Sequence, residues 1–209
     1  MSNGILGVSQ LEMLSQDGTG TITIVPPATN TNRTLTLPDE TGTIITTTSL
    51  PSIPNPLTSG TAVASTSGTA IDFTGIPSWV KRVTLLFQGV STNGTSNWVV
   101  RIGNGSIIST GYSASSTYFV GGGLSTQADT SGFLIRSDNA ANFISGAMVI
   151  SNISGNAWIE TWVGGNGPNT QTHLGGGQLA LGGVLDRIRL TTANGTDTFD
   201  SGSINIMYE

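Results

Sequence analysis

His173 is the only histidine of the chain, and imidazole is the one side chain whose ordinary pKa suits proton transfer near neutral pH. A Ser-His-Asp arrangement would need His173 as its base, but the sequence has no Gly-x-Ser-x-Gly turn to present the serine. Three copies of His173 on a three-fold axis would be an alternative, as a metal site. In the polar stretch NGPNTQTHLGGG a lone histidine is more often a surface or packing residue, and we favour that interpretation.

Carboxylates offer a second kind of chemistry, because glycoside hydrolysis needs two acids about 5 to 9.5 Å apart. Glu160 lies between Trp158 and Trp162, and Asp197 and Asp200 lie in NGTDTFDSG. In a strand, Glu160 would share the face of the two tryptophans. The two aspartates are typical of a turn and of the entry to the last strand.

Ion and phosphate sites are weakly indicated. An aspartate-lined calcium site from Asp186, Asp197 or Asp200 lacks the dense spacing of an EF-hand loop. The glycine runs at residues 103–105 and 164–167 lack the spacing of phosphate-binding loops, and we interpret them as hairpin turns. We therefore predict no catalytic residue, no cofactor and no metal site, and expect that the protein is not an enzyme.

Recognition is a further role for polar and aromatic side chains, since aromatic rings with polar groups are common at binding surfaces. The tryptophans alternate with polar residues and are expected in the core. Tyr112 and Tyr118, in TGYSASSTYFVGGG, are expected to be exposed. The candidate recognition loops are this segment and residues 166–173, with Tyr112, Tyr118, Asn166 and His173 as the residues of interest.

The strands that must position these residues come from a chain with few charged residues. Only 9% of its 209 residues are charged and the net charge is -5, whereas ordinary domains carry about 25% charged residues. Seven scattered Lys and Arg residues form no basic stripe, so we expect no nucleic-acid binding. No apolar run or signal-like start predicts membrane insertion or secretion, and the absence of cysteine excludes disulfides. We expect much of the surface to face other subunits, where ion pairs would carry a desolvation cost.

The first 50 residues predict a strand-rich arm. The runs GTITIV (residues 20–25), RTLTL (33–37) and GTIIT (42–46) are separated by turn residues, and the first two alternate apolar residues with threonine. The only helical candidate is short, at residues 9–15. Such small strands are marginal alone, so we expect residues 1–50 to dock on trimer mates or on a larger partner. The apolar residues expected to make that contact are Ile22, Ile24, Leu35, Leu37 and Ile44.

The remaining chain predicts a linker and one β-rich head. Residues 51–69 are rich in Pro, Ser, Thr and Gly and predict a linker. Residues 70–209 contain alternating runs, such as RVTLLFQ and SINIMYE, divided by turn signals that include residues 93–95, 121–123, 175–177 and 194–196. The predicted fold class is all-β, with an antiparallel β-sandwich or jelly-roll head.

Several segments resemble virion proteins of tailed bacteriophages. GTITIVPPATNTNRTLTLPDETGTIIT (residues 20–46) resembles a connector found in tail fibre and tail proteins. IPSWVKRVTLLFQGVSTNGTS, TGYSASS, SGFLIRSD and LDRIRLTTANGTDTFDSGSINIMYE resemble a C-terminal module of phage virion proteins. The resemblance covers most of the chain and brings no catalytic residue with it.

This resemblance implies a homotrimeric structural protein on the virion surface, made in the host cytoplasm. Its partners would be its own copies and other virion proteins of the tail, baseplate or major capsid, with host surface glycan as a further candidate. A short arm and a single head fit a short tail fibre for host attachment. They also fit a trimeric capsid decoration protein, whose arm adds strands to the shell.

Overall fold

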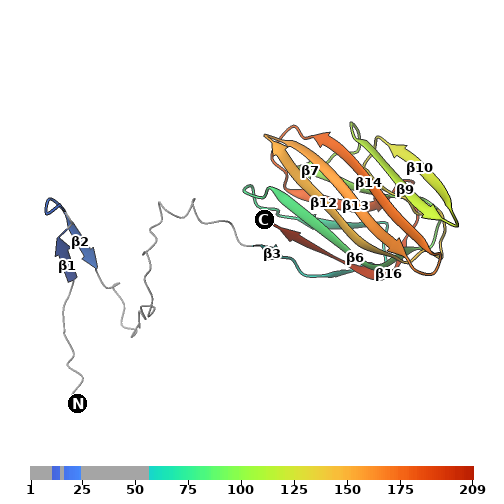
Figure 1. Cartoon of the computed structure of the whole chain (residues 1–209), viewed down its shortest axis with the longest axis horizontal. Helices are drawn as coiled ribbons and strands as arrows, with labels where there is room; N and C mark the ends of the chain where they lie inside the picture. Colours follow the sequence, from blue (N-terminus) through green and yellow to red (C-terminus); the bar gives the residue numbers. More distant parts are fainter. Residues whose placement is uncertain (1–10, 15–16, 25–56) are drawn as a thin grey trace, which may run out of the picture. The chain divides into compact units, whose positions relative to one another are not determined.

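The computed structural model describes residues 11–14, 17–24 and 57–209 (Figure 1). The chain divides into two compact units, Met1–Ser52 and Ile53–Glu209. All regular structure in the described residues is β-strand, as the sequence predicts. None of these residues forms a helix long and apolar enough to cross a membrane.

The N-terminal unit contains one antiparallel hairpin of β1 (Leu11–Leu14) and β2 (Thr21–Ile24). The strand predicted over residues 20–25 is thus confirmed, and Ile22 and Ile24 pair with Met13 and Leu11. The helix predicted over residues 9–15 is wrong, because residues 11–14 form β1. Their short apolar run offers only one turn of helix, whereas the hairpin satisfies its backbone against β2. Leu35, Leu37 and Ile44 lie outside the described residues.

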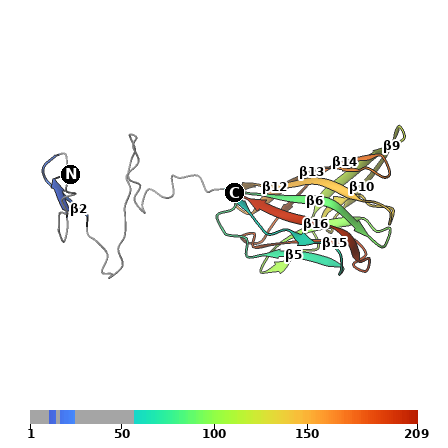
Figure 2. The ribbon, with the colours of Figure 1, turned by 90° about the horizontal axis from the view of Figure 1, so that it is seen from below.

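The C-terminal unit consists of two antiparallel sheets packed face to face, which Figure 2 shows as two layers. The larger sheet has nine strands among residues 57–209: β10 (Gly123–Asp129), β9 (Ser113–Val120), β14 (Gln171–Ala180), β13 (Ala157–Asn166), β12 (Ile144–Ser154), β6 (Arg82–Thr92), β16 (Phe199–Tyr208) and β3 (Thr58–Ser59) in spatial order, with β4 (Val63–Ala64) also on β16. The smaller sheet has five: β11 (Phe133–Ile135), β7 (Trp98–Asn104), β15 (Arg187–Thr192) and β5 (Ala70–Thr74), with β8 (Ser106–Ile107) on β7.

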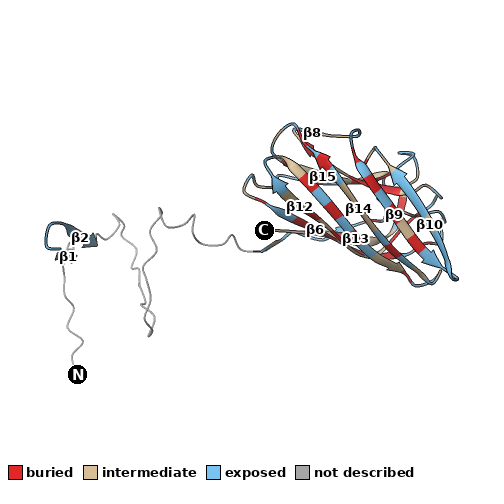
Figure 3. Ribbon diagram, turned by 45° about the horizontal axis from the view of Figure 1, so that its top comes forward, coloured by how far each residue is buried: buried red, intermediate tan, exposed pale blue. Residues whose placement is uncertain are grey.

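The core lies between the sheets and follows the alternation read from the sequence. Val83, Leu85 and Phe87 on β6 are buried, while their neighbours point outward (Figure 3). Phe87 meets Trp162 of β13 edge to face, with ring centroids 5.3 Å apart. Each such side chain contributes roughly 1.5 to 3 kcal/mol on burial, which lets the two-layered unit form without disulfides.

Residues 175–177 differ from the sequence prediction. They were expected to form a turn, but the three glycines lie inside β14. Gly177 faces the other sheet, where an added Cβ would lie 2.8 Å from Ala114 Cβ and 3.0 Å from a ring carbon of Phe133. The absence of a side chain therefore lets the β11 strand approach β14 closely, so glycine here marks close packing and not a change of chain direction.

Part of the expected linker also belongs to the sheet. β3 and β4, within residues 51–69, both pair with β16. The Gly60 N–H donates to the Ile206 carbonyl at 2.7 Å, and the buried Ser65 hydroxyl donates to the Ser201 carbonyl at 2.7 Å. Backbone pairing needs no apolar periodicity, which is why Ser, Thr and Gly residues can extend an edge. The folded unit thus includes residues 57–69, which precede the predicted start at residue 70, and residues 51–56 lie outside the described residues.

Candidate functional site

The four residues expected in exposed recognition loops are buried. Tyr118 lies in β9, Asn166 ends β13, His173 lies in β14, and Tyr112 directly precedes β9. The prediction that Tyr112 and Tyr118 are exposed is therefore wrong. Their segment alternates small or aromatic residues with Ser and Thr up to Tyr118, so it forms a strand in which Tyr118 points inward.

Tyr112 is a structural residue of the core. Its hydroxyl accepts a hydrogen bond from the Ile102 N–H at 2.7 Å and donates to the Ile108 carbonyl at 3.1 Å. Its ring meets Phe133 edge to face at 5.0 Å. Burial, opposed by the Ile102 hydrogen bond and by the charge of Arg101, raises the pKa of Tyr112 to about 12. The side chain thus ties β7 and β8 to the start of β9.

The other three residues come together at one end of the larger sheet. Tyr118 and His173 are cross-strand partners on β9 and β14, and their ring centroids are 5.7 Å apart. Asn166 lies one inward position beyond Gly164, which is the β13 partner of His173. Proximity of these side chains was not predicted, because it follows from the pairing of three strands.

Arg136 and Asp138, which sequence reasoning missed, cover Tyr118. The Arg136 guanidinium lies 5.1 Å from the centroid of the Tyr118 ring, and the Tyr118 hydroxyl donates a hydrogen bond to the Asp138 carboxylate. Arg136 also donates to the side chain of Gln127 at 2.7 Å. In the sequence, SGFLIRSD shows only a short apolar run followed by polar residues, so nothing in it indicates this contact.

Hydrogen bonds between amide side chains fix the turn between β13 and β14, which adjoins these residues. Asn166 donates to Asn142 at 2.6 Å and to Gln171 at 3.0 Å, and Asn169 donates to Asn142 at 2.6 Å. The Phe143 N–H donates to Asn166 at 3.2 Å. These bonds tie the β13–β14 turn to the connection before β12. Together, Tyr118, Arg136, Asp138, Asn142, Asn166 and His173 form what we call the polar cluster.

His173 is electrically neutral within this cluster. The residue is 0% exposed, and neither imidazole nitrogen has a hydrogen-bond partner. Burial lowers the pKa of His173 to about 4, and the charge of Asp138 opposes this shift while that of Arg136 adds to it. Among residues 57–209, no serine or other nucleophile hydrogen-bonds to the imidazole, and its surroundings there are those of a packed polar core.

Glu160 lies inside the molecule, on the face of Trp158 and Trp162 that the sequence predicted. It is 2% exposed, and neither carboxylate oxygen has a partner. Its register neighbours are Ile150 of β12 and Gly177 of β14. Burial raises the pKa of Glu160 to about 8. A polymer substrate on the surface does not reach this group.

The aspartates considered as partners of Glu160 or as calcium ligands lie apart from it: two of them have partners of their own, and Asp200 is exposed. Asp197 accepts from the Ser96 N–H at 2.9 Å and from Asn194 at 2.7 Å, while Asp200 is exposed in β16. Asp186 pairs with Arg187 at 2.8 Å, and this hydrogen bond, with help from the Gly105 N–H, lowers the Asp186 pKa. No group of three or more His, Asp and Glu side chains suited to a metal occurs among the described residues.

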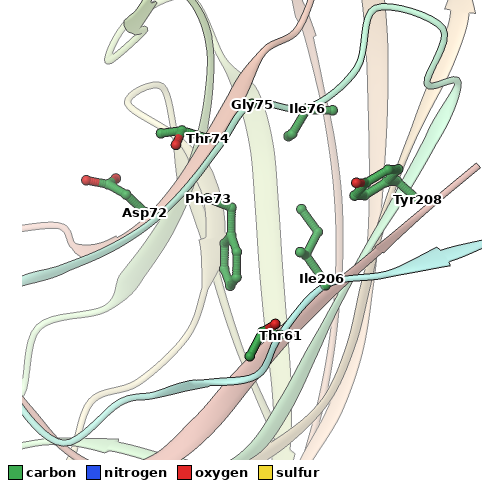
Figure 4. Close-up of a pocket in the computed structure, with 9 residues that line it drawn as sticks. Thr61, Asp72, Phe73, Thr74, Gly75, Ile76, Ile206 and Tyr208 are labelled. Carbon is green, nitrogen blue, oxygen red and sulfur yellow. The ribbon is translucent and has the colours of Figure 1, made fainter.

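A cavity of about 250 Å³ lies where the β5 edge of one sheet faces β16 of the other. Figure 4 shows the Phe73 ring and the Ile206 side chain next to each other, with the Asp72 carboxyl group pointing away from both. Asp72 instead pairs with Arg189 at 2.7 Å. The cavity thus has an apolar wall but no free charged group of its own lining to hold a ligand.

Five neighbouring strands, β10, β9, β14, β13 and β12, share an outward side, which we call the outer face. One row across it consists of Thr126, Thr117, Leu174, Val163 and Ala147. Figure 3 shows exposed positions alternating with buried ones along these strands. The outer face is therefore a continuous sheet surface and not a set of isolated side chains.

Comparisons with known proteins yield no relative: no family model, no curated protein and no solved structure matches the chain.

Proposed function

We propose that the chain is a non-enzymatic structural protein of a tailed-phage virion. It forms a homotrimeric surface appendage with a jelly-roll-like head, and acts as a short tail fibre for host attachment. Its N-terminal arm docks on other virion proteins. The resemblance of residues 20–46 to a tail-fibre connector, and of the head segments to a virion module, supports this assignment.

The structural observation that carries the proposal is the burial of the acid–base candidates. His173 and Glu160 both point into the packed core and have no partner there. A general acid or base must come within hydrogen-bond reach of its substrate, and these side chains lie beneath folded strands. What the head offers to its surroundings is sheet surface, which suits assembly and attachment.

Copy number in the particle tests the assignment. Purified particles of the phage that encodes the chain are digested, and the chain is quantified by mass spectrometry against the major capsid protein. We expect a few dozen copies at most, as a tail fibre requires. Hundreds of copies would instead indicate that the chain is a capsid decoration protein. Absence of the chain from the particles would contradict a virion role.

A binding measurement tests the attachment role separately. The purified full chain, carrying a fluorescent label, is incubated with host cells and with cells of a resistant strain. Saturable binding to the host alone is expected for an adhesion protein. Equal binding to both strains, or no binding to either, would contradict host attachment. The copy number would then still distinguish a tail protein from a capsid protein.

A further inference from the structure

The outer face is free of charge. Its five strands contain only two charged residues, Glu160 and Asp129. Glu160 is buried in the core, and Asp129 is opposite Ala114, which lies on the inward side of β9. Every side chain that these strands direct outward is therefore uncharged.

Large apolar side chains are exposed on the same face. Val163 is 63% exposed and Leu124 is 68% exposed, and Phe119, Ile159 and Leu174 are also exposed. They come from four different strands, and register places Val163 beside Leu174 and Phe119 beside Leu124. Contiguous apolar surface of this kind marks an interaction site more often than scattered exposed residues do.

The other sheet shows how this chain builds a surface that faces water. The outward side of β5, β7 and β15 carries Asp72, Arg101, Arg187 and Arg189, and Arg189 is the register partner of both Asp72 and Arg101. Arg189 forms a two-bonded ion pair with Asp72 at 2.7 Å. The smaller sheet is thus charged on its outward side, and the five strands of the outer face are not; the exposed charges of the larger sheet, Arg82 and Asp200, lie on β6 and β16.

The area of the outer face suits a protein partner. Five strands spaced about 4.8 Å apart, over about eight residues of about 3.3 Å each, cover about 600 Å² before side-chain relief is counted. A stable interface buries about 800 Å² on each partner. The outer face alone supplies most of that area.

The chemistry of the outer face selects its own copy as the partner. A charge buried against it would find no counter-charge to offset the loss of its hydration, so the partner surface must also be uncharged, and it must be flat to cover a sheet. Large residues such as Val163 and Leu174 alternate with small ones such as Gly165 and Gly176, and two such surfaces can interdigitate as packed sheets do. Among the described residues, the outer face is itself a broad sheet surface that is flat and uncharged, so a second copy of it meets these requirements.

We propose that copies of this chain associate through the outer face of the larger sheet. The inference deepens the homotrimer of the proposed function: three outer faces turn toward a common axis, and each is covered by its two neighbours. The charged side of the smaller sheet remains in contact with water. The partner is a second copy of the chain and not a glycan or another virion protein.

Sedimentation velocity of the full chain tests this interface. Val163→Glu places one charge on the outer face, and Val184→Glu is the matched control, because Val184 is 54% exposed in the connection between β14 and β15. We expect wild type and Val184→Glu to form the same oligomer, and Val163→Glu to associate at least 100-fold more weakly. Circular dichroism confirms that each variant is folded. A folded Val163→Glu that forms the wild-type oligomer, or a monomeric wild type, overturns the proposal.

A second measurement works even if Val163→Glu fails to fold. Because the chain has no cysteine, a single introduced thiol reports its own accessibility. Thr161→Cys lies on the outer face, and Thr74→Cys lies on the outward side of β5. We expect maleimide to label Thr161→Cys at least tenfold more slowly than Thr74→Cys, and equal rates overturn the proposal. Copy number in particles does not depend on this face, so a failure here is distinct from a failure of the virion assignment.

Discussion

At the scale of single residues, Glu160 is a core carboxyl group whose burial is offset by no hydrogen bond among the described residues. A carboxyl group buried without a hydrogen bond favours its neutral form, and burial raises its pKa to about 8. The folded protein therefore binds a proton that the unfolded chain releases near pH 4.5. The contribution of Glu160 to the free energy of unfolding should fall as pH rises from 4.5 to 8, by about 1.4 kcal/mol per pH unit.

Glu160→Gln should remove this dependence, because the amide is neutral at every pH. Urea unfolding at intervals from pH 4.5 to 8.5 measures it. We expect wild type and variant to be similar at pH 4.5, and the variant to be more stable by up to about 5 kcal/mol at pH 8.5. Asp200→Asn, at an exposed position of β16, should retain the wild-type slope. Identical slopes for wild type and Glu160→Gln would show that Glu160 is ionised in the fold.

His173 produces the opposite dependence at lower pH. Its pKa is about 4 in the fold and about 6.5 in an unfolded chain, so the unfolded state binds the extra proton between these values. Stability from His173 is complete above pH 6.5 and is lost as pH falls toward 4. As the only histidine, it gives a single imidazole signal in proton NMR. We expect that signal to stay constant down to about pH 5, and a titration midpoint near 6.5 would mean that the imidazole reaches water.

The sequence anticipated some of these residues and misjudged others, for a physical reason. Alternation correctly placed Glu160 on the face of the tryptophans. The same alternation is present around Tyr118, but which side of a strand is covered depends on the segments packed against it. Arg136 and Asp138, which cover Tyr118, arrive from a connection whose position is set by long-range pairing.

At the scale of elements, β3 and β4 decide whether residues 57–65 are linker or fold. Ser65 is completely buried and donates to the Ser201 carbonyl of β16, whereas Ser67 is exposed. Ser65→Ala should lower the free energy of unfolding by about 1 kcal/mol, since it leaves the partly buried Ser201 carbonyl without this donor. Ser67→Ala should change it by less than about 0.5 kcal/mol. Equal effects in urea unfolding would mean that this segment does not belong to the sheet.

Strands with alternating apolar residues were predictable, and the two-residue strands β3 and β4, which are too short to show alternation, were not. β6 and β7 carry the pattern in their own side chains. β3 and β4 exist because β16 presents an unpaired backbone edge. The prediction of a turn at residues 175–177 failed for a related reason. Three glycines in a row are typical of a turn, and only the close approach of Phe133 to Gly177 explains why they lie inside β14.

At the scale of the whole molecule, the low charge content is unevenly distributed. Among the described residues, the outward side of the smaller sheet carries Asp72, Arg101, Arg187 and Arg189, and the outer face of the larger sheet carries no charged side chain. Composition alone predicted a surface facing other subunits. It did not predict that five neighbouring strands would have an uncharged outward side, because this distribution appears only when the strands are assigned to their layers.

The neighbouring ends of the folded unit have a mechanical consequence. Ser59 pairs with Met207, and the last residue, Glu209, exchanges backbone hydrogen bonds with Arg82 of β6. A pull on residue 57 along the strand axis therefore loads the bonds of β3 and β16 in shear, so that they resist together and do not open one by one. If they yield, the load passes along the chain to β4, which pairs with the same strand β16. Tension applied at residue 57 is thus resisted first by the pairing of β3 and then by that of β4, both on β16.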